Sequence, residues 1–178
     1  ESNIGHAPSP IVRLGCSPER PPALPRALEA IANADLIVLG PGSLYTSLLP
    51  NLLVPELVGA IKRSKAPRLY ICNLMTQPGE TDGLDVRGHI RAIEAQLATL
   101  GIEPRLFTAV LAQDDLPESD LVRYYQSRGA DPVRCDAEGL RSDGYDVTQA
   151  PLQGVRPTAT LRHDSRSLAL AVMRFYRT

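Results

Sequence analysis

The sequence predicts an α/β domain built on an open, mostly parallel β-sheet with helices on both faces. Short apolar runs that fit buried strands alternate along the chain with longer stretches in which apolar residues recur at helical spacing. Two of these runs end in polar loops that contain glycine, as parallel strands do where they meet a ligand. We therefore expect residues 1–178 to form a single Rossmann-like domain with three layers, α/β/α.

The first half of the chain is predicted to supply two strands of this sheet and the helices that follow them. Prolines break Ser2–Pro10 and Ser17–Pro25, so both are predicted as connections. Proline is tolerated in the first turn of a helix, and Lys62 and Arg63 suit the carboxyl end of one. The predicted elements are a short strand at Ile11–Leu14, a helix at Pro25–Ala34, a strand buried on both faces at Leu36–Leu39, one or two helical turns within Leu44–Leu49, a helix at Val54–Ser64 and a buried strand at Arg68–Cys72.

The second half continues this alternation of helices and strands. Ile90, Ile93 and Leu97 recur on one helical face, and Gly101 is placed to end that helix. Arg141–Gly154 shows no clear period and is predicted as a hairpin or an irregular excursion. The other predicted elements are helices at Val86–Leu100 and Pro117–Arg128, strands at Leu106–Leu111, Pro132–Arg134 and Thr158–Arg162, and a final helix that Asp164 or Ser165 caps and that ends near Phe175.

The strand at Leu36–Leu39 stops at a glycine loop, Gly40-Pro41-Gly42, after which Ser43 occupies the position of a helix N-cap. Glycine allows positive φ and lets another molecule approach the backbone, and helix N-termini attract anions. The same residues also fit a tight turn with capping hydroxyls and no ligand. As a binding site, the loop would offer backbone and hydroxyl donors to a diphosphate from Gly40, Gly42, Ser43, Tyr45, Thr46 and Ser47.

A second polar loop, Asn73–Thr81, follows the strand at Arg68–Cys72. If both strands are parallel, the two loops lie at the same edge of the sheet and form two sides of a cleft. The second loop supplies the candidate binding residues Asn73, Thr76, Gln77 and Glu80. The Glu80 carboxylate suits sugar or ribose hydroxyls, or a Mg²⁺ ion bound together with a nucleotide diphosphate. It equally suits a turn residue that caps a neighbouring helix.

Composition and charge limit the classes of partner. The net charge of -1 gives no case for nucleic acid or an anionic membrane surface as a partner. No apolar run approaches the roughly 20 residues that cross a bilayer. Cys16, Cys72 and Cys135 are far apart and odd in number, which suits reduced thiols in a cytoplasmic protein. The absence of a Cys-x-x-Cys or Cys-x-x-His spacing argues against zinc.

The three histidines do not suggest a catalytic triad, and we predict no catalytic residue. His89 lies near the start of a predicted helix, after the second polar loop, and is a candidate for lining the site. His163 and Asp164 are read as a capping pair, and His6 as a loop residue.

Two long motifs, GPGSLYTSLLPNLLVPEL from Gly40 and YICNLMTQPGETDG from Tyr70, resemble the gluconeogenesis factor family of bacteria. ESNI, YYQSRGADPV and LRHDSRSLA, which start at Glu1, Tyr124 and Leu161, resemble it too. The family is distantly related to 2-phospho-L-lactate transferase, an enzyme of coenzyme F420 synthesis. Its members begin with a strand, a Gly-rich loop and an acidic stretch that this sequence lacks. We therefore expect this chain to be the C-terminal portion of a longer nucleotide-binding protein.

The resemblance implies a protein that binds a uridine-diphosphate sugar such as UDP-N-acetylglucosamine and regulates carbon metabolism, cell-wall synthesis and cell shape. It also gives Tyr125 the role of stacking on uracil, whereas its helical neighbours alone suggest a half-buried packing residue. Arg162 is either a solvated strand end or a charge-assisted contact to the diphosphate. One departure is Leu111-Ala112-Gln113, because the family tends to carry a Val-Asn pair after this strand.

Three functions remain open at this point. The first is a cytoplasmic regulator that binds a nucleotide sugar without catalysis. The second is a transferase of the 2-phospho-L-lactate transferase type that acts on a phosphate-linked substrate, and the third is a scaffolding domain whose loops are only structural. A sheet that lacks a neighbour on one side exposes a strand edge, so we also expect a homo-oligomer or association with the protein's own N-terminal portion.

Overall fold

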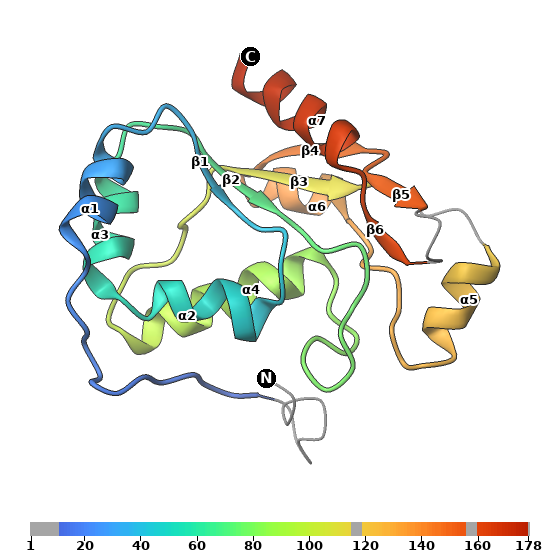
Figure 1. The fold of residues 1–178 in the computed structure, drawn as a ribbon, viewed down its shortest axis with the longest axis horizontal. Helices are drawn as coiled ribbons and strands as arrows, with labels where there is room; N and C mark the ends of the chain where they lie inside the picture. Colours follow the sequence, from blue (N-terminus) through green and yellow to red (C-terminus); the bar gives the residue numbers. More distant parts are fainter. Residues whose placement is uncertain (1–10, 115–118, 156–159, 178) are drawn as a thin grey trace.

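The computed structural model describes residues 11–114, 119–155 and 160–177, and the predicted loop at Ser2–Pro10 lies outside them. It confirms the predicted α/β fold (Figure 1). The helical segments are α1 (Pro25–Ala32), the π-helical η2 (Leu44–Leu48), α2 (Leu49–Leu52), α3 (Pro55–Arg63), α4 (Val86–Thr99), α5 (Asp120–Gln126), α6 (Ala137–Ser142) and α7 (Ser165–Arg177).

The main sheet has four strands in the spatial order β1-β2-β3-β4, and every neighbouring pair is parallel. A separate antiparallel pair, β5 and β6, lies beyond the carboxyl end of β4 (Figure 1). The strands are β1 (Ile37–Leu39), β2 (Arg68–Ile71), β3 (Ala109–Gln113), β4 (Asp146–Ala150), β5 (Gln153–Val155) and β6 (Leu161–His163).

Helices cover both faces of the sheet, because alternate strand residues point to opposite sides. Tyr70, Cys72 and Val110 pack into a core with η2, α2, α3, α4 and α6. Leu69 and Ile71, from the other face of β2, pack with residues of α7. Figure 1 places α7 on one side of the sheet and α2 and α4 on the other, which confirms the three layers.

The prediction that Leu36–Leu39 is buried on both faces is wrong. β1 is the edge strand of the main sheet among the described residues, and all three of its residues keep some exposure. Val38, which points to the face that α7 covers further along, is 40% exposed. The apolar run therefore marks a strand with one uncovered side.

We expect the chain to associate with itself through this edge, because an open strand edge beside an exposed apolar side chain invites pairing. Val38→Lys should weaken the association, since a lysine on an edge strand opposes pairing. Val12→Lys is the matched control, because Val12 is 93% exposed and lies outside the strands. Sedimentation velocity over a range of concentrations measures the effect. A wild-type chain that stays a monodisperse monomer throughout would contradict the prediction.

Three predicted strands differ from the structure. Ile11–Leu14 is not a strand, because the Gln96 side chain bonds both backbone groups of Leu14. Leu14 N donates to Gln96 Oε1 at 2.9 Å, and Gln96 Nε2 donates to the Leu14 carbonyl at 3.1 Å. Pro132–Arg134 forms only an isolated bridge between Pro132 and Met75. The strand predicted at Leu106–Leu111 begins later and continues to Gln113.

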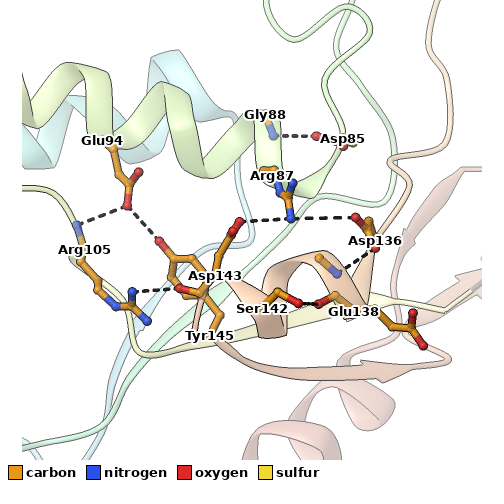
Figure 2. Close-up of polar contacts among 11 residues, drawn as sticks. Asp85, Arg87, Gly88, Glu94, Arg105, Asp136, Glu138, Ser142, Asp143 and Tyr145 are labelled. Atoms are coloured by element: carbon orange, nitrogen blue, oxygen red, sulfur yellow. Dashed lines mark hydrogen bonds and ion pairs between the residues drawn. The ribbon is translucent and has the colours of Figure 1, made fainter.

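The prediction of a hairpin or an irregular excursion at Arg141–Gly154 is also wrong. This stretch contains the end of α6, all of β4, which joins the main sheet, and the start of β5, which pairs with β6. A network of polar contacts holds this region at the amino ends of β3 and β4 (Figure 2). The hydroxyl of Tyr145 donates to Glu94 Oε1 at 2.9 Å, and the Arg105 guanidinium lies 5.0 Å from the Tyr145 ring centre. Burial and the bond to Glu94 raise the pKa of Tyr145. The network ties α4 to the turn between α6 and β4, away from the two polar loops.

Candidate functional site

A cleft of about 780 Å³ opens where the two polar loops meet the β5–β6 pair and α5. This volume lies within the usual range for pockets that hold small ligands and cofactors. The cleft is lined by Pro41, Gly42, Ser43, Asn73, Leu74, Met75, Thr76, Gln77, Pro78, Glu80, Tyr125, Arg128, Ala130, Thr160, Leu161, Arg162 and His163.

In the glycine loop, Gly40 allows the backbone to turn close to β2, and Gly42 bonds the loop to Asn73. Gly40 has φ +92°, and a Cβ on it would lie 2.4 Å from the carbonyl oxygen of Ile71. Gly42 N donates to Asn73 Oδ1 at 3.1 Å, while Asn73 Nδ2 donates to the Gly42 carbonyl at 3.0 Å. The Asn73 amide therefore joins the ends of β1 and β2, and the two loops do meet at one edge of the sheet as predicted.

A relay of hydroxyl groups connects the two loops a second time. Thr46 Oγ1 donates to Ser43 Oγ at 2.6 Å, and Ser43 Oγ donates to Glu80 Oε2 at 2.7 Å. Ser43 stands at the N-cap position but makes no capping bond with its side chain. Glu80, which lines the cleft, thus accepts a hydrogen bond from the opposite loop. A hydroxyl held against a carboxylate is an arrangement that can recognise a ligand hydroxyl or accept a proton from one.

Four of the predicted binding residues lie outside the cleft lining: Gly40, Tyr45, Thr46 and Ser47. Gly40 packs against β2, and Thr46 acts through Ser43. Tyr45 packs against the main core, and burial together with the Glu80 charge raises its pKa. The Ser47 side chain is exposed, and its carbonyl accepts from Asn51 Nδ2 at 2.7 Å. The helical turn also continues beyond Pro50 to Leu52, because proline is accommodated early in α2.

Residues of the second loop are fixed by the segment that follows α5. Thr76 N donates to the Asp131 carbonyl at 2.7 Å, and Asp131 N donates to Thr76 Oγ1 at 2.8 Å. Gln77 N donates to Thr81 Oγ1 at 2.8 Å, whereas Gln77 Oε1 is buried without a hydrogen-bond partner among the described residues. The buried Thr76 thus fixes the second loop against the segment after α5, and Gln77 Oε1 is an acceptor that a ligand could use.

The opposite wall of the cleft carries an aromatic ring and two cations. Tyr125 packs partly against the α7-side core, and its hydroxyl accepts from Leu161 N at 3.3 Å. The Arg128 guanidinium lies 4.6 Å from the ring centre of Tyr124. With Arg162 on β6, the described lining has two guanidinium groups and one carboxylate, which favours an anionic ligand.

Arg128 and His163 line the cleft but were not predicted to do so. Arg128 lies in the turn that follows α5, where its backbone N donates to the Tyr125 carbonyl at 2.9 Å, so its place beside Tyr125 depends on how the helix ends. His163 adjoins Arg162 at the end of β6. Burial lowers the pKa of His163, and a hydrogen bond to the Cys72 backbone partly offsets the decrease.

His89, a candidate for lining the site, does not line the cleft. Its side chain is fully buried in α4, and Nδ1–H donates to the Asp85 carbonyl at 2.8 Å. Burial lowers the pKa of His89, and its Nε2 has no hydrogen-bond partner among the described residues. His89 is therefore a core residue held neutral by its surroundings.

We expect the free energy of unfolding to fall as the pH drops below about 6.5. The unfolded chain binds protons at its histidines near that pH, whereas the folded chain keeps His89 and His163 neutral to a lower pH, so protonation favours unfolding. His89→Gln should flatten the dependence between pH 7.5 and 5.5, and His163→Gln should flatten it less, because His163 is less buried. Denaturant titrations at several pH values measure this. Equal slopes in wild type and both variants would refute the assignment.

No group of three or more His, Cys, Asp or Glu residues in the described part of the chain is arranged to hold a metal ion. Glu80 is the one carboxylate in the described cleft lining, so Mg²⁺ would need the phosphates of a ligand for most of its coordination. The three cysteines are free thiols. Among the described residues, no single helix has the length and apolarity to cross a membrane, although Leu44–Leu52 and Pro55–Arg63, bent by 77°, meet the test when taken together.

Comparison with known proteins adds a family. The family model described as 2-phospho-L-lactate transferase CofD matches residues 1–153. A relative from Nostoc sp. is 44% identical over 99% of this chain, and the gluconeogenesis factor of Bacillus subtilis is 36% identical over 95%. A crystal structure of a Bacillus halodurans protein superposes with a TM-score of 0.86 at 37% identity, covering 97% of this chain. This chain spans 38% of the Nostoc relative, 51% of the Bacillus subtilis protein and 53% of the crystallised chain.

Proposed function

The chain belongs to the CofD family and matches relatives named gluconeogenesis factor over nearly its whole length, and on this premise we propose that its cleft binds a nucleoside-diphosphate sugar. A uridine-diphosphate sugar such as UDP-N-acetylglucosamine is the proposed ligand. The bound protein would act in the cytoplasm as a regulator of carbon metabolism, cell-wall synthesis and cell shape.

The observation that carries the proposal is the convergence of unlike groups on one cleft. Asn73 and the glycine loop form one side, and Arg128 and Arg162 stand on the other. Guanidinium groups pair with phosphate oxygens in a bidentate geometry, so a diphosphate fits between these walls. Glu80 and Ser43 then suit the sugar or ribose hydroxyls, and Tyr125 suits the base.

A titration of the chain with a panel of ligands tests the proposal. UDP-N-acetylglucosamine should bind, and uridine monophosphate should bind at least tenfold more weakly, because it lacks the second phosphate and its charge-assisted contacts. A guanosine-diphosphate sugar reports how far the base matters. Equal binding of the monophosphate and the diphosphate, or no binding of either, would overturn the proposal.

A transferase of the 2-phospho-L-lactate transferase type is the second candidate, and the Ser43–Glu80 contact favours it. Glu80 Oε2 lies 2.7 Å from a hydroxyl oxygen inside the cleft, which is the distance at which a carboxylate can accept a proton from an attacking hydroxyl. Incubation of a nucleotide sugar with candidate alcohol acceptors distinguishes the two functions. Release of a nucleotide that requires Glu80 would establish the transferase, and binding without turnover supports the regulator.

Tyr125→Ala is expected to weaken binding by about 1–3 kcal/mol, the scale of base–aromatic stacking, and to do so more for one base than another. Tyr125→Phe should keep most of the affinity, because the ring survives, and lose only the support that the hydroxyl gives to Leu161. Calorimetric titrations with uridine and guanosine diphosphate sugars measure both variants. If Tyr125→Ala binds both nucleotides as the wild type does, Tyr125 is a packing residue.

A further inference from the structure

The β5–β6 pair forms one wall of the cleft but belongs to no part of the main sheet. Its position relative to the two loops therefore depends on other contacts. Arg162, which faces Gly154 across this pair, carries one of the two cations in the described part of the cleft lining. The contacts that hold β5–β6 in place therefore also determine the position of the Arg162 guanidinium.

A buried side chain at the end of β3 supplies such a contact. Gln113 is 4% exposed, and its Oε1 accepts from Leu152 N at 2.8 Å. Leu152 is fully buried and directly precedes β5. Its carbonyl in turn accepts from Asp164 N at 2.7 Å. Asp164 Oδ2 accepts from Ser167 N at 2.8 Å, which caps α7.

These bonds form a continuous chain from the main sheet to the cleft wall: Gln113 to Leu152, Leu152 to Asp164, and Asp164 to the first turn of α7. Arg162 lies two residues before Asp164. On its other side, Leu161 N donates to the Tyr125 hydroxyl. The backbone on both sides of Arg162 is thus held from outside its own strand pair, once by α5 and once by the sheet through Gln113.

We propose that Gln113 is a positioning residue, which holds the β5–β6 wall in register with the two loops so that Arg162 can contact the diphosphate of the ligand. This inference rests on the proposed function for its ligand. Gln113 is not among the residues that line the cleft, and its amide Nε2 donates to Asp114. It would act only through Leu152 and Asp164.

The chain contains a matched control for a buried glutamine. Gln96 is also 4% exposed, and its Oε1 also accepts from a leucine backbone N–H, that of Leu14, at 2.9 Å. It sits on α4 and anchors the segment before α1, outside the cleft lining. Methionine fills a space similar to that of glutamine but accepts only weakly. Gln113→Met therefore leaves the buried Leu152 N–H without its partner, and Gln96→Met leaves both backbone groups of the partly buried Leu14 without theirs. Both variants should lose stability.

The test is a double-mutant cycle in the 178-residue chain, with UDP-N-acetylglucosamine as the probe and affinity measured at two salt concentrations. Gln113→Met should lower affinity roughly tenfold, the scale of a lost charge-assisted contact, and reduce its dependence on salt. Arg162→Ala should then add little to Gln113→Met, whereas it should keep its full effect on Gln96→Met. Additive losses in the first pair, or an unchanged salt dependence, would overturn the proposal.

A second readout needs no nucleotide and separates the positioning role of Gln113 from the proposed binding of a nucleotide sugar. In the free chain, amide exchange at Leu152, Leu161 and Asp164 should accelerate in Gln113→Met and stay as in wild type in Gln96→Met. If the wild type binds no nucleotide diphosphate, the proposed function fails, and the exchange pattern still decides whether Gln113 holds the wall. Unchanged protection at these three amides in Gln113→Met would overturn the positioning role whether or not the nucleotide binds.

Discussion

Gly40→Ala is expected to lower the free energy of unfolding by about 3 kcal/mol or more, the largest effect on stability that we predict for a single methyl group. Gly40 has φ +92°, a conformation that residues with a Cβ rarely adopt. The new Cβ would also lie 2.4 Å from the Ile71 carbonyl oxygen, which is backbone and cannot rotate away. To relieve the overlap, β1 must move away from β2.

Gly42→Ala is the matched control, because Gly42 lies two residues further along the same loop. A Cβ there would first meet Leu48 Cδ2 at 3.4 Å, an ordinary contact with a side chain, and Gly42 is not among the residues with positive φ. Denaturant unfolding of both variants measures the difference. Equal stabilities for the two variants would show that the loop tolerates a side chain at Gly40 and that its shape is not fixed there.

Arg162→Ala is expected to reduce affinity for UDP-N-acetylglucosamine by at least tenfold, because a charge-assisted bond to a phosphate is worth about 1.5–3 kcal/mol. The loss should be similar for every diphosphate nucleotide and should shrink as salt rises, since the contact is made to the phosphates and not to the base. Arg162→Lys should recover only part of the affinity, because lysine lacks the bidentate fork.

Arg174→Ala provides the control for a general change of charge, because Arg174 is an exposed cation on α7 outside the cleft lining. It should leave the affinity close to that of the wild type. Calorimetric titration at low and moderate salt distinguishes the variants. A loss in Arg162→Ala that depends on the base, or an equal loss in Arg174→Ala, would contradict the assignment of Arg162 to the diphosphate.

Much of the fold was predictable, because the strongest signals in the sequence are the ones that packing uses. Val86–Leu100 has a clear helical period, and α4 follows it almost to the residue. Arg68–Cys72 is a mostly apolar run, and β2 lies there, paired with β1 on one side and with β3 on the other. The final helix begins at the predicted position, and Asp164 caps it as expected, because Asp164 Oδ2 accepts from Ser167 N.

The elements that were missed have weak local signals. β4 contains a single buried apolar residue, Val147, so its sequence does not read as a buried strand, and pairing with β3 decides its conformation. β1 shows the opposite error, because an apolar run alone does not say whether a neighbouring strand or helix will cover it. Leu14 forms no strand because Gln96, which is far away in the sequence, takes its backbone bonds.

From the residue pattern alone, the candidate site was predictable where it follows from strand ends, whereas Tyr125, on α5, was expected from the family resemblance. Asn73 and Gly42 were expected at one edge of the sheet because their strands are parallel, and they exchange two hydrogen bonds there. The Ser43–Glu80 bond depends on how two loops fold against each other, which no period in the sequence encodes. The same holds for Gln113, whose bond to Leu152 crosses from the sheet to a separate strand pair.

Mapping of amide chemical shifts on addition of UDP-N-acetylglucosamine tests most directly whether this cleft is the binding site. The amides of Gly42, Asn73 and Leu161 should shift together and saturate with one affinity, because they lie on the two walls of a single cleft. The amides around Glu94 and Tyr145, at the other end of the strands, should remain unchanged. Shifts confined to that distant network, or no saturable shifts at all, would contradict the assignment of the cleft as a nucleotide-sugar site.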